Sequence, residues 1–92
     1  MESTTPVFTP EFEELSIYPN PATDFINIDL PSAHKDATIL VRDIQGRLIS
    51  KQIVPAQQSQ LVLDAADMKG LFIIEIIEEG VLVATEKVVV VK

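Results

Sequence analysis

The sequence predicts an all-β fold, an antiparallel β-sandwich of about seven short strands. Three observations lead to this prediction. Apolar and polar residues alternate in short runs along most of the chain, which is the period of a half-buried strand. Residues that favour turns separate these runs. No segment has the length and the apolar period of an ordinary helix.

The beginning of the chain differs in composition from the rest. Residues 1–13 mix proline, serine, threonine and acidic residues without a period, which is typical of a linker. We therefore divide the chain into a linker over residues 1–13 and one folded domain over residues 14–92.

The first two strands are expected over residues 14–18 and 25–30. Between them lies Pro19-Asn20-Pro21. Asparagine at the first position and proline at the second are favoured in a type I turn, so we expect such a turn to begin at Asn20.

The next pair of strands forms a predicted hairpin. Residues 37–41 and 47–54 flank a turn that begins at Asp43 and ends at Gly46. Asp at the first position and Gly at the fourth suit a type I turn that is closed by a left-handed glycine. A fifth strand is expected over residues 57–63.

A short polar segment follows the fifth strand. Residues 64–70 are interpreted as a single helical turn, with Asp64 as its N-cap and Gly70 as its left-handed terminator. Residues 71–77 are apolar on both faces apart from Glu75, which predicts a central strand. Glu78 and Glu79 are interpreted as a solvated hairpin tip.

The last strand is expected over residues 81–91, and its end is unusual. Val88, Val89, Val90 and Val91 are apolar on both faces of the strand. One interpretation is a central strand buried on both faces. The other is an edge strand that stays available for pairing with a partner or with a second copy of the chain. Seven such strands are typical of an immunoglobulin-like sandwich.

Composition excludes several classes of function. Fourteen acidic and seven basic residues give a net charge of -7, which disfavours binding to nucleic acid or to anionic membranes. The chain has no cysteine, so disulfides, thiolate catalysis and cysteine-ligated zinc are excluded. Hydrophobic residues make up 47% of the chain, an ordinary value for a globular domain.

No residue pattern indicates catalysis, a cofactor or a metal. The single histidine, His34, lies in a polar loop, and no serine has the context of a nucleophile elbow. Acidic residues in the turns could in principle hold calcium, but their spacing matches no calcium loop, and aspartate is common in turns. These residues are Asp24, Asp36, Asp43, Asp64 and Asp67. We therefore expect a non-enzymatic domain.

Four segments, in this order, resemble a known family. Residues 17–22 resemble its opening Y-P-N-P-A signature, and residues 41–48 its hairpin of D-x-x-G followed by a basic residue. Residues 68–74 resemble the step from glycine into an apolar strand, and residues 86–92 the closing apolar strand with a basic end. Over residues 14–92 the chain is similar to the type A C-terminal sorting domain of the type IX, or Por, secretion system of Bacteroidetes.

The resemblance implies a signal rather than an activity. Such a domain follows a cargo domain, is recognised in the periplasm by the type IX machinery, and is typically removed by a cell-surface sortase. The protein would then pass through the periplasm and end at the outer membrane, on the cell surface or in the medium. A homodimer through an edge strand is possible. The residues expected to be recognised are Pro19, Asn20, Pro21, Asp43, Gly46, Gly70, Lys87, Val88, Val89, Val90, Val91 and Lys92.

Two other functions remain open. One is a non-catalytic adhesion or carbohydrate-binding module, which would need exposed aromatic rings. The aromatic residues lie mostly at strand or linker positions where we expect them to belong to the core, which disfavours that function. They are Phe8, Phe12, Tyr18, Phe25 and Phe72. The other is a small acidic hydrolase, which the absence of catalytic residue patterns disfavours.

Overall fold

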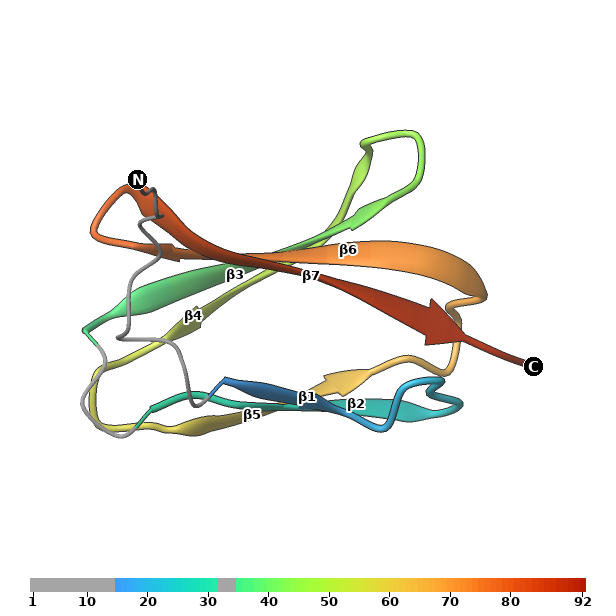
Figure 1. Cartoon of the computed structure of the whole chain (residues 1–92), viewed down its shortest axis with the longest axis horizontal. Coiled ribbons are helices and arrows are strands. Elements are labelled where there is room, and N and C mark those ends of the chain that lie inside the picture. The colour runs from blue at the N-terminus through green and yellow to red at the C-terminus, as the bar shows by residue number, and fades with distance from the viewer. Residues whose placement is uncertain (1–14, 32–34) are drawn as a thin grey trace, which may run out of the picture.

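The computed structural model describes residues 15–31 and 35–92, and in them the chain forms two antiparallel sheets that pack face to face (Figure 1). The strands are β1 (Ser16–Tyr18), β2 (Phe25–Asp29), β3 (Ala37–Asp43), β4 (Leu48–Val54), β5 (Gln60–Asp64), β6 (Gly70–Glu78) and β7 (Val81–Val90). This confirms the predicted all-β sandwich. The predicted linker and His34 lie outside the described residues.

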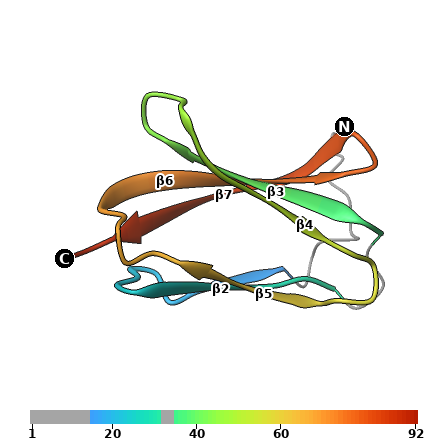
Figure 2. The same ribbon diagram turned by 180° about the vertical axis from the view of Figure 1, so that it is seen from behind.

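The two sheets differ in size and in how their edges are arranged. One sheet has the order β1-β2-β5, and the other has the order β4-β3-β6-β7. Strand β6 pairs with β3 on one side and with β7 on the other, which confirms the predicted central strand. Strands β4 and β5 lie along the same side of the sandwich (Figure 2). Strand β7 forms the opposite edge of the larger sheet.

The core is built from alternate residues of facing strands. Ile26 and Ile28 of β2 point inward from the small sheet, and Ile39 and Ile74 point inward from the large one. Each fully buried side chain of this kind stabilises the fold by about 1.5–3 kcal/mol. The buried apolar residues are Ala22, Ile26, Ile28, Leu30, Ala37, Ile39, Val41, Val54, Leu63, Ala65, Phe72, Ile74, Ile76, Val88 and Val90.

The predicted hairpin between β3 and β4 is confirmed. The Gly46 amide donates a hydrogen bond of 3.0 Å to the Asp43 carbonyl, and Gly46 has a φ of 86°. A side chain at this φ would be strained, so glycine is the residue that closes the turn without cost.

The predicted helical turn over residues 64–70 is wrong. Asp64 is the last residue of β5, and its Oδ1 accepts a hydrogen bond of 2.9 Å from the Ala66 amide. The Met68 amide then donates to the Ala65 carbonyl at 3.0 Å, which closes a tight turn instead of a helix. Gly70, with a φ of 105°, starts β6 directly.

Glu78 also differs from its interpretation as a solvated residue. Its side chain is buried at the end of β6, on the inner face of the large sheet. Its Oε2 accepts a hydrogen bond of 2.7 Å from the Lys35 amide. Of the two glutamates, Glu79 is exposed at this turn. In the described ranges, no helix is long and apolar enough to cross a membrane.

Candidate recognition site

Two segments far apart in the sequence meet at the edge of β7. Ala22, which follows the Pro-Asn-Pro motif, pairs in parallel with Val90. The Ala22 amide donates to the Val89 carbonyl at 2.8 Å, and the Val91 amide donates to the Ala22 carbonyl at 2.8 Å. The backbone around Ala22, which belongs to none of the seven strands, therefore pairs with the end of β7.

The Asn20 side chain strengthens this junction. Its Oδ1 accepts a hydrogen bond of 3.1 Å from the Val89 amide, and its Nδ2 donates one of 3.2 Å to the Lys87 carbonyl. The predicted type I turn at Asn20 is not formed. The peptide bonds Tyr18-Pro19 and Asn20-Pro21 are both cis, and β7, rather than an internal turn, supplies the partners of residues 20 and 22.

The Lys92 side chain bonds the end of the chain to two loops, one with Thr23 and Asp24 and the other with Ala65. Its Nζ donates to the Thr23 carbonyl at 2.6 Å and to the Ala65 carbonyl at 2.8 Å. It also lies 3.7 Å from the Asp24 Oδ1. Since the Ala65 amide donates to the Asp24 carbonyl at 2.7 Å, the lysine joins a junction that already connects both loops.

The interpretation of residues 88–91 as a strand buried on both faces is wrong, and the interpretation as an edge strand is correct for its position in the sheet. Val88 and Val90 are 0% and 1% exposed, whereas Val89 and Val91 are 38% and 45% exposed. The strand therefore buries one face and exposes the other. It lies at the edge of its sheet, but the edge from Val89 to Val91 is already occupied by residues 20–22, so a partner strand cannot pair there without displacing them.

The β3–β4 hairpin is organised by Asp43. Its Oδ1 accepts hydrogen bonds of 2.9 Å from the amides of Gln45 and Arg47, and its Oδ2 lies 2.8 Å from the Arg47 Nε. Partial burial of the carboxyl raises its pKa, but the hydrogen bonds from Arg47 and Gln45 and the charge of Arg47 outweigh this, so the pKa of Asp43 lies below its usual value.

The structure brings most of the predicted recognition residues to one end of the sandwich. Gly70 pairs with Val90, and Asp43 pairs with Phe72 next to Val88. The hairpin that carries Gly46 thus projects from the same end as the terminus of β7 (Figure 1). The residues that form the continuous junction are Pro19, Asn20, Pro21, Gly70, Lys87, Val88, Val89, Val90, Val91 and Lys92. Of these, Pro19, Asn20, Pro21, Lys87, Val89, Val91 and Lys92 are exposed.

The sequence reasoning did not identify the backbone groups that complete this site. The carbonyls of Thr23 and Ala65 hold Lys92, and no residue type marks a carbonyl that will do so. Ala22 lies in the Y-P-N-P-A segment and is completely buried. A small side chain at this position is the sequence feature that could have indicated its burial.

Two aromatic rings that were expected in the core are on the surface. Tyr18 is 41% and Phe25 is 56% exposed, while Phe72 is buried as expected. Tyr18 and Phe25 lie on the outer face of the small sheet because Ile17 and Ile28 pair on its inner face. A carbohydrate-binding module was disfavoured because the aromatic rings were expected in the core, and the exposure of Tyr18 and Phe25 removes that argument.

The Tyr18 hydroxyl belongs to a polar network on that outer face. It donates to the Asp29 Oδ2 at 2.9 Å, and the Gln60 Nε2 donates to the Asp29 Oδ1 at 3.0 Å. The hydrogen bond to Asp29 raises the pKa of Tyr18, and desolvation and the charge of Asp29 raise it further.

The acidic residues of the turns act mainly on the backbone. The carboxylates of Asp36, Asp43 and Asp64 each accept a hydrogen bond from a backbone amide. Among residues 15–31 and 35–92, no group of three or more histidine, cysteine, aspartate or glutamate side chains is placed to hold a metal ion.

Comparison with known proteins agrees with this geometry. A family model described as "secretion system C-terminal sorting domain" matches residues 16–91. None of the curated proteins matches the chain. Among solved structures, a DUF3244 family protein with an immunoglobulin-like β-sandwich fold from Bacteroides vulgatus ATCC 8482 is similar, with a TM-score of 0.64 and 13% identity over 87% of each chain. At that identity the likeness shows an immunoglobulin-like fold.

Proposed function

The chain belongs to the family of type IX secretion system C-terminal sorting domains, and we propose that it directs a cargo protein, joined to its N-terminal side, from the periplasm through the outer-membrane translocon. A cell-surface sortase then removes the domain. The cargo remains at the outer membrane, on the cell surface, or is released.

One observation supports this proposal and makes it more specific. The first and last family-like segments form a single junction, in which Asn20 bonds to the backbone of Val89 and Lys87 across 69 and 67 residues of sequence. An unfolded chain would not hold these segments together. We therefore propose that the machinery recognises a folded surface and not a linear tail.

The exposed side chains of this surface suit a protein partner. Pro19 and Pro21 lie on one side of the junction, and Val89 and Val91 lie on the other. Lys87 is exposed on the same face of β7 as Val89, because side chains two apart share a face. An apolar contact beside one cation fits a partner surface with an apolar centre and an acidic rim.

The test is export of a periplasmic reporter fused in front of residues 1–92 in a type IX-competent strain. The unchanged fusion should reach the cell surface or the medium. Val89→Asp should reduce export several-fold, whereas Val62→Asp, at an exposed valine of similar kind on β5, should not. Both variants should melt at similar temperatures.

Two outcomes would contradict the proposal at different points. Retention of the unchanged fusion in the periplasm would show that the domain is not a sufficient signal. Equal export of the Val89→Asp and Val62→Asp fusions would leave the signal intact but would remove this surface as the part that is recognised.

A further inference from the structure

The two edges of the large sheet differ, because residues 20–22 bond to the end of β7. Among residues 15–31 and 35–92, strand β4 pairs only with β3, so no described strand covers its other edge. It exposes Leu48, Ile49 and Ile53, the last by 67%, and contains one charged residue, Lys51, and no proline. Natural proteins usually protect an edge strand with charges, prolines or a covering segment, so an edge this apolar is suited to pairing with another strand.

A β-bulge near the start of β4 changes the direction of one side chain. Val41 pairs with Ser50, but the next residue, Arg42, pairs with Leu48. Ile49 is therefore the extra residue of the bulge, which can re-aim a side chain. Ile49 lines a cavity between the two sheets beside this edge.

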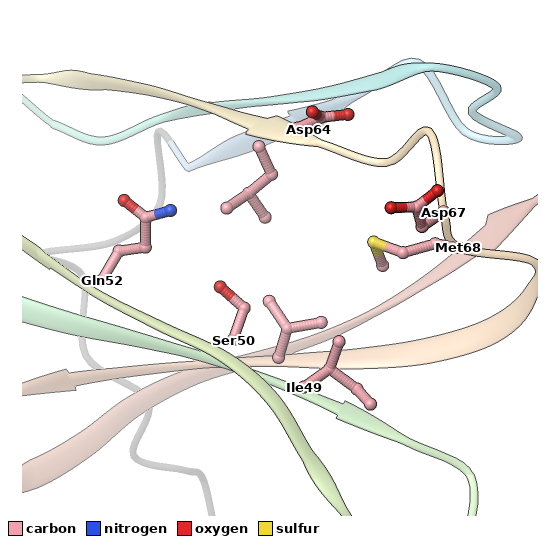
Figure 3. A pocket seen from close by; sticks show the side chains of 8 residues that line it. Ile49, Ser50, Gln52, Asp64, Asp67 and Met68 are labelled. Atoms are coloured by element: carbon pink, nitrogen blue, oxygen red, sulfur yellow. The ribbon is translucent and has the colours of Figure 1, made fainter.

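The cavity is small and mostly apolar (Figure 3). Its volume is about 240 Å³, and Val41, Leu63, Ile49 and Met68 provide its apolar lining. Small-molecule sites usually have volumes of about 300–1,000 Å³. A cavity of this size, open beside a free strand edge, instead suits a single side chain of an extended peptide, since strand addition combines backbone pairing with pockets for alternate side chains.

The charge of the residues around the cavity indicates which kind of segment can bind there. Asp67 lines the wall formed by the turn after β5, and no basic residue is among the described residues that line the cavity (Figure 3). A basic segment is therefore favoured. A second copy of this chain is disfavoured, because it carries a net charge of -7 and its own open edge strand has Lys51 as its single charge.

We propose that the open side between β4 and β5 binds an extended segment of a partner protein. The segment adds as a strand along residues 50–54. It places an apolar side chain in the cavity and directs a lysine or arginine toward Asp67. The inference rests on the proposed function, which requires the domain to meet partner proteins during export, but its test requires no export.

The test uses a defined probe, the capped peptide Thr-Lys-Thr-Leu-Thr-Lys-Thr, and the complete chain labelled with nitrogen-15. In a strand, alternate residues share a face, so leucine and both lysines can face the cavity together. The peptide should shift the amide resonances of residues 50–54 and of Asp67 and Met68. A peptide with glutamate in place of lysine, or one N-methylated on the amides that would pair with β4, should not bind.

A matched pair of charge reversals separates the local effect from the overall charge. Asp67→Lys should weaken binding several-fold. Glu86→Lys, which changes the net charge equally on an exposed residue of β7, should bind almost as well as the unchanged chain. Thermal melting of both variants checks that they are folded.

The following results would overturn the inference: no binding at millimolar peptide, shifts confined to another surface, or equal affinities for Asp67→Lys and Glu86→Lys. Shifts at β4 that depend on protein concentration without peptide would identify a second copy as the occupant instead. Periplasmic retention of the unchanged reporter fusion would contradict the proposed function and leave the peptide-binding result in place.

Discussion

Residues 88–91 are all valine, three at the end of β7 and one directly after it, so two double substitutions of the same kind can be compared. Val88→Ala with Val90→Ala truncates two side chains that are 0% and 1% exposed, and Val89→Ala with Val91→Ala truncates two that are 38% and 45% exposed. Each change removes two methyl groups, worth about 1.6 kcal/mol at about 0.8 kcal/mol per buried group. The cavity that remains raises the cost to about 2–3 kcal/mol at each buried site.

The buried pair should therefore lower the free energy of unfolding by about 4–6 kcal/mol, if the two effects add. A chain of 92 residues has a total stability of about 5–14 kcal/mol, so this double variant should lose at least about a third of that stability. The exposed pair should cost about 1 kcal/mol or less. Urea titration followed by circular dichroism measures both.

Similar losses for the two pairs would refute this reasoning, because it depends on the burial of alternate residues.

The same reasoning predicts what happens when the end of the chain is deleted. Deleting residues 88–92 removes both buried valines together with the backbone partners of Ala22 and one of the two backbone partners of Asn20. We expect the truncated domain to unfold, so that loss of export on truncation would not by itself indicate a linear recognition sequence.

Four further predictions concern single residues. Absorbance titration of Tyr18, the single tyrosine in a chain without tryptophan, should give a midpoint above 10, and Asp29→Ala should lower it. Because the folded state holds this proton more tightly, the contribution of Tyr18 to stability should be complete below pH 10 and be lost as the pH rises above it. Asn20→Ala should cost about 1–2 kcal/mol in urea titrations through the loss of two exposed hydrogen bonds. Gly46→Val, at a φ of 86°, should cost more than about 1 kcal/mol by the same measurement. Since the pKa of Asp43 is lowered in the fold, its stabilising effect should be complete above the usual aspartate pKa and disappear as the pH falls below it, and an Asp43→Asn variant should show a weaker acid dependence.

Local chemistry explains the parts of the fold that the sequence predicted correctly. The hairpin at Asp43 and Gly46 depends on contacts within five residues. The central position of β6 follows from a run that is apolar on both faces. Residues 64–70 show the limit of this reasoning, because aspartate followed by glycine suits a helical turn and a tight turn between strands equally well. The choice depended on whether β5 continued to Asp64, which pairs with Phe25.

Long-range pairing decided the parts that the sequence did not predict. Whether residues 88–91 formed a buried strand or a free edge depended on Asn20 and Ala22, and Asn20 lies 69 residues from its partner Val89. Glu78 was expected in solvent because its partner, the Lys35 amide, is also remote, at a separation of 43 residues. The exposure of Phe25, by contrast, was predictable, since it alternates with Ile26 and shares a face with Asn27.

The parallel direction of the pair between Ala22 and Val90 has a mechanical consequence. Tension applied between the N-terminal side of the domain and residue 92 pulls these two segments in opposite directions along their common axis. The hydrogen bonds of Asn20 and Ala22 are then loaded together, in shear, instead of opening one after another. Because the rate of unfolding governs resistance to force, a short junction of this geometry would keep the domain folded under tension.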